Sequence, residues 1–341
     1  MKEVKLQEIC RIEKGKQIDT SQLRTDSPYK YINGGIKVSG YYHEYNTDSE
    51  AVLVSEGGAS CGYVNYVNEK FWCGCHCYKL TESKTLAKYL YYALKGNQDK
   101  IMELRSGAAM PNIKKDAFKN MSLLVDFDRN DQQAIVETLD CIQKAINNKT
   151  DELLSLDELV KSRFIEMFGD PQVNGKKFPV KKFIDIVTLQ RGHDLPVQSR
   201  DCNGTIPVYG SNGLLGFHSV AKRNEGLITG RSGTIGEVYI SNTPFWPLNT
   251  TLYSINTHGN NLIYLKYLLI FFDLKRFVSG AGVPTLNRNE FHGKDLIDVP
   301  ISLQNEFAEF VKLIDKSKFI VQQQIKDLQE LLDSKMDEYF R

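Results

Sequence analysis

Internal repetition constrains this chain of 341 residues more than any other feature. Six segments of its first half recur in the same order in its second half, at an offset that falls from 177 to 173 residues. The longest pair is Ser-Gly-Ala-Ala-Met-Pro-Asn-Ile at 106–113 and Ser-Gly-Ala-Gly-Val-Pro-Thr-Leu at 279–286. The other pairs are 14–16 with 191–193, 31–35 with 208–213, 40–41 with 216–217, 52–58 with 227–233, and 71–72 with 245–246. Chance can produce one such match, whereas six in order indicate a tandem duplication.

Each repeat ends in a segment whose apolar residues alternate at spacings of four and three. These seams run over 135–167 and 307–339, and adding 172 to each position of the first gives a position of the second. Five heptads with this pattern predict a coiled coil, and two matched seams predict that the helices pair with each other. The alternative is that each helix packs only on its own repeat. The seam residues are Leu139, Ile142, Ile146, Leu153, Leu156, Val160, Val311, Ile314, Val321, Ile325, Leu328 and Leu332.

The segments between the seams have mixed composition. Short β-rich runs such as 51–55 and 226–229 are interrupted by Gly, Asn and Ser, and one helix is expected in each repeat, over 86–105 and 262–278. We therefore expect the α+β fold class, with two tandem globular domains joined by two long α-helices that form an antiparallel coiled coil. The expected boundaries are 1–127 for the first domain, 128–170 for the central helix, 171–301 for the second domain and 302–341 for the C-terminal helix.

The net charge of the whole chain is near zero, with 43 basic and 42 acidic residues. A neutral total argues against nucleic acid as the main partner. The distribution changes that inference, because the two globular segments carry net charges of +3 and +4 while the helical segments carry −4 and −2. Basic domains beside acidic helices favour contact with DNA in one place and with protein in another.

The apolar runs and the cysteines of the sequence indicate the cellular location of the protein and the redox state of its thiols. The longest apolar run, 262–272, is too short to span a membrane and contains Lys266, and residues 1–11 lack the apolar core of a signal peptide. Seven irregularly spaced cysteines fit reduced thiols better than a disulfide framework. We therefore expect a cytoplasmic protein.

Catalytic signals are weak. Gly-Ala-Ser-Cys-Gly at 58–62 spells the nucleophile elbow of serine hydrolases, but its counterpart at 233–236 has no serine. Cys73, Cys75, His76 and Cys77 could bind a metal, although no second ligand pair accompanies them, and buried free thiols are the alternative. The sequence also lacks a Walker A loop and a Rossmann fingerprint. We expect no catalytic residue and no metal site.

Two globular repeats, each followed by a heptad helix of matching phase, closely resemble the specificity subunit of type I restriction-modification enzymes. Residues 279–286, followed by Val299-Pro300 and Gln304, look like the Gly-x-x-x-Pro-x-Leu run that closes a recognition domain in that family. The first repeat has a similar run at 110–113, followed by Gln132-Gln133, but departs from the pattern at 108–110. The loop at 230–236 is also similar to one in the family. The resemblance covers essentially the whole chain.

The resemblance implies that each globular unit is a target recognition domain that reads one half of a bipartite, asymmetric site in double-stranded DNA. It implies that the helices set the spacer and dock methylation (M) subunits, of which two are expected, and that restriction (R) subunits join the complex. S-adenosylmethionine, ATP and Mg would then be bound by partner subunits, so that this chain supplies specificity without catalysis. A coiled-coil scaffold that does not read DNA and a cysteine or metal enzyme are the competing hypotheses.

Candidate DNA-binding residues combine cationic, amide and hydroxyl side chains with glycine-rich loops, because phosphates attract Lys and Arg while base edges pair with Arg, Asn or Gln. Tyr41, Tyr42, Phe217 and both tryptophans are expected in the core rather than stacked on bases. The candidates are Lys14, Lys16, Asn33, Arg105, Ser106, Asn112, Arg191, His193, Ser211, Asn212, Lys222, Arg223, Arg231, Ser232, Thr285, Asn287 and Arg288.

Overall fold

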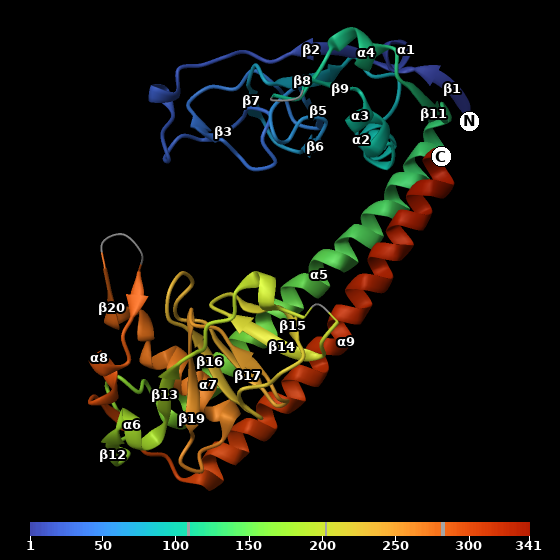
Figure 1. Cartoon of the computed structure of the whole chain (residues 1–341). Coiled ribbons are helices and arrows are strands. Elements are labelled where there is room, and N and C mark those ends of the chain that lie inside the picture. The colour runs from blue at the N-terminus through green and yellow to red at the C-terminus, as the bar shows by residue number, and fades with distance from the viewer. Residues whose placement is uncertain (108–109, 202, 281–283) are drawn as a thin grey trace. The chain divides into compact units, whose positions relative to one another are not determined.

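The computed structural model describes residues 1–107, 110–201, 203–280 and 284–341. The chain divides into two compact units, one made of Met1–Thr150 with Gln323–Arg341 and the other of Asp151–Gln322. Each unit contains one α+β module and about half of each long helix, α5 (Arg129–Phe168) and α9 (Ile301–Phe340) (Figure 1). Module one denotes residues 2–125, and module two denotes residues 180–297.

Module one is built on a four-stranded antiparallel sheet with the strand order β2-β8-β5-β6. Its central strand β5 is buried at every position, as its Ala-Val-Leu-Val-Ser sequence requires. A smaller sheet has the order β4-β3-β7, in which β3 and β7 are parallel. The strands are β1 (Lys2–Lys5), β2 (Arg11–Lys14), β3 (Tyr29–Ile32), β4 (Gly40–Tyr42), β5 (Ala51–Ser55), β6 (Val64–Val67), β7 (Phe71–Cys73), β8 (Cys77–Thr81), β9 (Arg105–Ser106), β10 (Asn112–Ile113) and β11 (Ser122–Val125). The helices are α1 (Leu6–Ile9), η1 (Thr20–Gln22), α2 (Ala87–Gly96), α3 (Gln98–Glu103) and α4 (Lys115–Lys119).

Module two repeats this topology strand for strand. Its main sheet has the order β13-β19-β16-β17 and its smaller sheet β15-β14-β18, again with one parallel pair, β14 and β18. The duplication inferred from the sequence is therefore also a duplication of strand connectivity. The strands are β12 (Val180–Lys182), β13 (Thr188–Arg191), β14 (Ile206–Gly210), β15 (Gly213–His218), β16 (Gly226–Gly230), β17 (Val238–Ser241), β18 (Trp246–Pro247), β19 (Thr251–Asn256), β20 (Val278–Ser279), β21 (Thr285–Leu286) and β22 (Asp295–Ile297). The helices are α6 (Phe183–Ile186), η2 (Val197–Ser199), α7 (Leu262–Phe272), η3 (Leu274–Phe277) and α8 (Asn289–His292).

The helix expected in each repeat is interrupted before its expected end. In module one α2 stops at Gly96, and the buried Asn97 donates from its side chain to the Ala93 carbonyl at 2.8 Å before α3 begins. In module two Asp273 ends α7 in a left-handed conformation, with a φ of 54°. A polar residue that bonds to the backbone locally therefore breaks the expected helix in both repeats.

A buried glutamine fixes the start of each long helix to its module. Gln132 accepts a hydrogen bond from the Leu86 N–H at 2.8 Å and donates to the Asp126 carbonyl at 2.7 Å. Gln304 makes the matching pair of bonds, from Asn261 N–H at 2.9 Å and to the Val299 carbonyl at 2.8 Å. These bonds join each helix start to the turn before α2 or α7.

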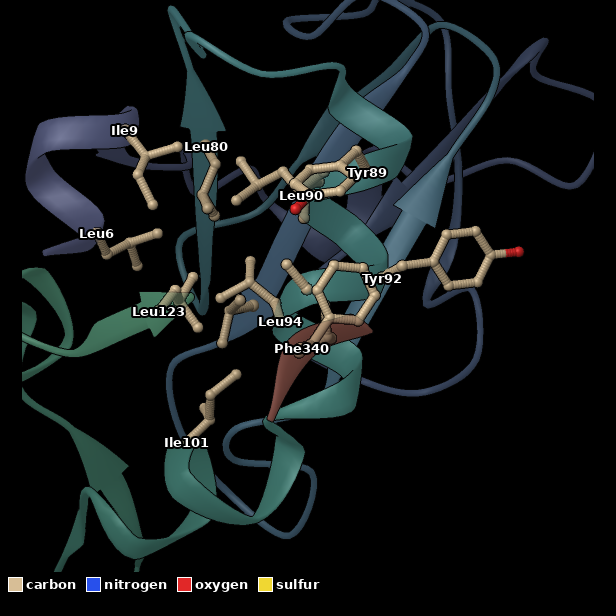
Figure 2. Close-up of a cluster of buried hydrophobic side chains, with 14 of the residues drawn as sticks. Leu6, Ile9, Leu80, Tyr89, Leu90, Tyr92, Leu94, Ile101, Leu123 and Phe340 are labelled. Atoms are coloured by element: carbon tan, nitrogen blue, oxygen red, sulfur yellow. The ribbon is translucent and has the colours of Figure 1, made fainter. Parts of the chain in front are cut away.

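The two long helices pair in an antiparallel manner inside each unit. In the first unit, Leu139 and Ile142 from early turns of α5 share a core with Leu332 and Phe340 from late turns of α9. Figure 2 shows Phe340 beside Tyr89 and Tyr92 of α2, and the rings of Tyr89 and Phe340 meet edge to face at 5.3 Å. The C-terminal turn of α9 is therefore part of the core of the first unit.

In the second unit, Val160 and Phe164 of α5 share a core with Phe307 and Val311 of α9. Ion pairs from Arg163 to Glu306 and from Lys318 to Asp157 flank that seam. The seam residues expected from the heptad pattern are all buried or half-buried, which is consistent with helix pairing. Among the described residues, no helix is long and apolar enough to cross a membrane.

Candidate nucleic-acid interface

A glycine turn after the first strand of each main sheet is held by the same bonds in both modules. The N–H groups of Gly15 and Lys16 donate to the carbonyls of Cys77 and Cys73 at 3.1 and 2.9 Å. In module two, the N–H groups of Gly192 and His193 make the equivalent bonds at 3.0 and 2.8 Å. A Cβ atom at Gly15 or Gly192 would lie 2.2 or 2.1 Å from a backbone oxygen, so only glycine fits. The turn places a cationic or imidazole side chain on each side of the glycine.

A second loop follows β5 in module one and β16 in module two. Hydrogen bonds tie this loop to β10 or β21. The Glu56 carbonyl accepts a bond from Ile113 N–H at 2.9 Å, and the Arg231 carbonyl accepts one from Leu286 N–H at 2.7 Å. Isolated β-bridges continue the contact, from Gly57 to Asn112 and from Ser232 to Thr285. The fold therefore brings candidates from distant repeat motifs to one edge of each module.

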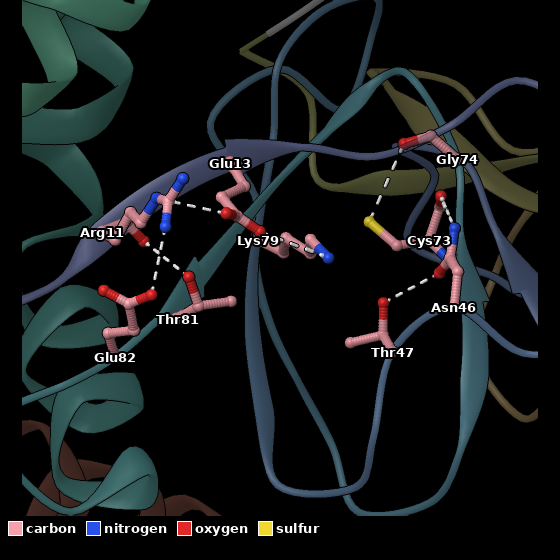
Figure 3. A network of polar contacts seen from close by, with 9 residues as sticks. All are labelled: Arg11, Glu13, Asn46, Thr47, Cys73, Gly74, Lys79, Thr81 and Glu82. Carbon is pink, nitrogen blue, oxygen red and sulfur yellow. Dashed lines mark hydrogen bonds and ion pairs between the residues drawn. The ribbon is translucent and has the colours of Figure 1, made fainter.

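Module one carries a basic hollow of about 380 Å³ beside its glycine turn. Lys14 and Lys16 line the hollow together with Arg11, Lys79 and Lys115. Figure 3 shows that this charge is partly neutralised, because Glu13 pairs with Arg11 at 3.2 Å and with Lys79 at 3.4 Å. Arg11, Lys79 and Lys115 were not among the candidates expected from the sequence. Lys79 reaches the site through the pairing of β8 with β2, which no local motif reveals.

The carboxylate of Glu56 neutralises one of the two lysines at the turn. Its Oε2 atom lies 2.7 Å from Nζ of Lys14, and its Oε1 atom accepts a bond from the Tyr78 hydroxyl at 3.1 Å. Burial and the nearby Glu56 charge raise the pKa of Tyr78. Lys16 has no carboxylate within ion-pair distance among the described residues, and its charge is available to an external anion.

The other candidates of module one do not line the basic hollow. Asn33 accepts a bond from His76 N–H at 3.1 Å, and Arg105 donates to the Cys61 carbonyl at 2.9 Å. Ser106 donates from its hydroxyl to the Asn112 carbonyl at 3.1 Å, which joins β9 to β10. These side chains hold loops in place, although Arg105, Ser106 and Asn112 remain exposed.

Module two has a more mixed hollow, of about 370 Å³, at the corresponding edge. Arg191 approaches Asp194 at 3.7 Å, Asp194 accepts a bond from the Asn249 amide, and Arg231 donates to the Asn249 carbonyl at 3.2 Å. Four candidates therefore gather in or beside this hollow, namely Arg191, Ser211, Asn212 and Arg231. Four other polar side chains line the hollow without having been expected from the sequence, namely Asp194, Arg200, Asn249 and Thr250.

Lys222, Arg223 and His193 lie around β18 and β19 of module two. Nζ of Lys222 sits 4.7 Å from the centroid of the Trp246 ring, and Arg223 donates to the Ile255 carbonyl at 2.6 Å. The His193 ring lies 3.2 Å from the Tyr253 hydroxyl, and burial together with Lys222 lowers the pKa of His193. None of these three side chains lines the hollow of module two.

Asn287 and Arg288 shape the turn after β21. Asn287 accepts a bond from Asn289 N–H at 3.1 Å, and Arg288 donates to the Leu189 carbonyl at 3.3 Å. Thr285 lies in the bridge to Ser232 already described. The centres of the two Ser-Gly motifs, at 108–109 and 281–283, lie outside the described residues.

The expectation that the aromatic residues of the β4 and β15 strands belong to the core is wrong for two of them. Tyr41 and Phe217 are 38% and 45% exposed at equivalent strand positions, because alternation along the strand turns them away from the core. Tyr42 and Trp246 are buried as expected, and Trp72 is half-buried.

The cysteine-rich turn of module one forms no metal site among the described residues, since no group of three or more potential ligands is placed to hold an ion. Cys73 and Cys77 are buried in a small apolar cluster with Ile32 and Phe71. A hydrogen bond between the two thiols raises the pKa of Cys73 and lowers that of Cys77. Cys75 instead contacts the side-chain oxygen of Gln17 at 2.6 Å.

Together these features define a class of protein. It is a tandem-module protein, in which each module presents a polar, loop-built surface and is followed along the chain by a long helix. The surfaces offer arginine, lysine, asparagine and hydroxyl donors, which suit a polyanion with readable polar edges.

Comparisons with known proteins narrow this class. The fold matches the crystal structure of an S subunit of a type I restriction-modification system from M. genitalium, with a TM-score of 0.64 at 20% identity over 100% of this chain and 96% of that one. A second match, with a TM-score of 0.61 at 10% identity over 99% and 97%, comes from a structural study of complex assembly and conformational transition in a type I R-M system.

Sequence comparison is more specific for the first repeat. Residues 1–156 match the model of the type I restriction modification DNA specificity domain. Putative type I specificity subunits from Mycoplasma pneumoniae and Mycoplasma genitalium are 31% and 32% identical over 159 and 140 residues, which is 46% and 40% of this chain. These matches bear out the resemblance seen in the sequence, because residues 1–156 match the type I specificity domain and the curated relatives are specificity subunits. The matches span only 42% and 36% of these two relatives.

Proposed function

We propose that this chain is the sequence-specific DNA-recognition subunit of a type I restriction-modification system. Each module, within the expected domains 1–127 and 171–301, reads one half of a bipartite site in double-stranded DNA. The observation that carries this proposal is a shared backbone framework with different side chains at equivalent positions. Lys14 corresponds to Arg191 and Glu56 to Arg231 in loops held by the same hydrogen bonds. Two such readers select two different half-sites, so the whole site is asymmetric.

The candidate DNA contacts divide between positioning and reading. Lys14 and Lys16 in module one and Arg191 in module two suit phosphate oxygens, because they are exposed cations beside tight glycine turns. Ser211, Asn212, Ser232 and Asn112 offer the short polar groups that pair with base edges. Near-neutral total charge is compatible with this role, since the positive charge is concentrated in the two modules.

The long helices set the spacer between half-sites and dock the methylation subunits, of which two are expected. An apolar patch on the part of α9 in the second unit supports docking, because Leu313, Phe319 and Ile320 are 62%, 70% and 56% exposed. Exposed apolar patches of this kind are typical of protein interfaces. Restriction subunits complete the complex in the cytoplasm. The chain itself is non-catalytic, and S-adenosylmethionine, ATP and Mg bind to the partner subunits.

Mapping of modified bases tests this function. The chain is expressed with its methylation subunit in a host that lacks other DNA methylation, and modified positions are located across the genome. We expect one interrupted, asymmetric motif that disappears when this chain is omitted. Exchanging module two for that of another specificity subunit should change only one half of the motif. A coiled-coil scaffold would leave the motif unchanged when the chain is exchanged, and that result would contradict the proposal.

A further inference from the structure

The hollow of module two is lined by a residue that differs in kind from its counterpart in module one. The three-residue helices η1 and η2 precede equivalent positions, Leu23 in module one and Arg200 in module two. Leu23 packs beside Ile18, Tyr31 and Tyr42, and a Cβ atom at Gly40 would lie only 2.9 Å from its side chain. The space above the equivalent Gly216 is open, with no atom within 4 Å of such a Cβ among the described residues.

Arg200 is the one arginine of module two whose guanidinium has no partner among the described residues. The half-buried side chain lines the hollow, and its Nε atom is buried without a hydrogen bond. The other arginines of the module each pair with Asp194, with a backbone carbonyl or with the Gln172 side chain. The guanidinium of Arg200 is committed to no protein acceptor among the described residues, so a ligand that accepts from it breaks no protein contact.

We propose that Arg200 reads a guanine, donating from its guanidinium to the O6 and N7 atoms of the base. This inference rests on the proposed function and assigns a specificity-determining residue to module two. Arginine bound in this bidentate manner is the commonest specific contact with guanine in the major groove. Ser211 and Asn212, which also line the hollow, contact the flanking positions. Module one, with Leu23 at the equivalent position, reads its half-site without this contact.

The composition of the hollow favours a base edge over a phosphate. Asp194 contributes a carboxylate whose oxygen already accepts from Asn249, and this negative charge repels a phosphate but not a neutral base. Leu195, Pro196 and Leu215 form apolar walls. Apolar side chains can contact base edges such as the thymine methyl group, whereas they offer nothing to a charged phosphate.

The test compares Arg200→Leu, which introduces the residue of module one, with Arg200→Lys, which keeps the charge but loses the bidentate geometry. Each full-length variant is assembled with its methylation subunit and selected on a pool of random duplex DNA. Arg276→Leu is the matched control, because Arg276 lies in module two, packs over Phe272 and Phe277, and does not line the hollow. Thermal unfolding of every variant verifies the fold.

We expect the wild type to require a guanine at one position of the second half-site. Both Arg200 variants should lose about 5- to 150-fold of that discrimination, while the first half-site stays unchanged and Arg276→Leu keeps the whole motif.

The inference is overturned if the second half-site requires no guanine, or if both Arg200 variants keep the wild-type motif. It is also overturned if only Arg200→Leu weakens binding and does so equally at all sequences, since that result identifies a phosphate contact. A wild type that selects no motif refutes the proposed function itself, which is a distinguishable outcome. A variant that fails to fold shows an altered thermal transition, whereas loss of the guanine requirement with an unchanged transition supports the inference.

Discussion

Lys14 and Lys16 flank the same glycine but have different electrostatic surroundings. Lys14 is paired with Glu56 at 2.7 Å, whereas Lys16 has no such partner among the described residues. Each phosphate neutralised by a cation contributes about 0.9 to the slope of log affinity against log salt. We therefore expect Lys16→Ala to reduce the slope for DNA binding by about 1, and Lys14→Ala to reduce it by less. Titration of binding to one duplex at several salt concentrations measures both slopes.

The control for this prediction is Lys326→Ala, on the part of α9 that lies in the first unit, where Lys326 faces Glu330 at 3.7 Å. Its slope should equal that of the wild type. Equal slopes for all three variants and the wild type would show that the glycine turn does not face the DNA backbone.

His292 makes the stability of module two depend on pH. Its ring lies beside Phe183 and Phe291, and its Nε2 atom accepts a bond from Leu189 N–H at 3.4 Å. Burial, and then the nearby Arg288 charge, lower the pKa of His292 below its ordinary value of 6.5. The unfolded chain thus takes up a proton at a higher pH than the folded chain does. The stabilisation is complete above pH 6.5 and is lost as the pH falls towards the folded-state pKa.

Urea denaturation at pH 7.5 and pH 5.5 tests this sign. The midpoint of the wild type should fall at the lower pH, and His292→Phe, which keeps a ring among Phe183 and Phe291, should show a smaller fall. His193 contributes in the same direction, because burial and Lys222 lower its pKa as well. A fall of the same size in His292→Phe as in the wild type would contradict the assignment to His292.

Single residues are where sequence reasoning is weakest. Lys14, Arg191 and Arg231 could be selected because they stand next to repeated glycine motifs. Lys79, Lys115 and Arg200 carry no such local mark and reach their sites only through strand pairing or loop packing. Comparing the repeats position by position would have exposed Arg200, since its counterpart is the apolar Leu23.

At the scale of elements, Phe164 on α5 lies in an aromatic cluster of the second unit. It is fully buried and contacts the rings of Phe271, Phe168 and Phe307 at 4.7, 4.9 and 5.5 Å. Phe164→Ala should lower the free energy of unfolding by about 3–5 kcal/mol, because it removes the ring and leaves a cavity. Denaturation monitored by circular dichroism measures the loss. Leu159→Ala, an exposed change on the same helix, should cost far less, and equal losses would contradict the packing argument.

The long helices could be predicted because their heptad pattern is a strong, long-range signal. The structure places them at Arg129–Phe168 and Ile301–Phe340. The interruptions at Asn97 and Asp273 could not be predicted in the same way, because a single polar residue with a favourable local bond outweighs the helix preference of its neighbours. The tertiary bond from Asn97 to the Phe340 carbonyl, at 3.3 Å, is also invisible in the local sequence.

At the scale of the whole molecule, duplication explains why so much could be inferred from one sequence. A motif found in one repeat can be checked at the equivalent position of the other repeat. The Ser60 elbow and the Cys73–Cys77 turn occur in one repeat only, so they say little about a function that both modules share. A difference at an otherwise shared position, such as Glu56 and Arg231, instead indicates where specificity diverges. Arg200 is such a difference, because it follows η2 in module two where Leu23 follows η1 in module one.

If the helices act as a ruler, their length sets the spacer between the half-sites. One extra heptad adds seven residues at a rise of about 1.5 Å, or roughly 10 Å, which corresponds to about three base pairs of duplex DNA at about 3.4 Å each. Copying 144–150 after Thr150 and 323–329 after Gln322 lengthens both helices while preserving the seam, since these points lie at the boundary between the units. The mapped motif should keep both half-sites and gain a spacer about three base pairs longer.

Inserting the heptad into α5 alone should abolish the motif, because the paired seams then differ in length. An unchanged spacer in the double insertion would refute the ruler, since nothing else in the change alters either module.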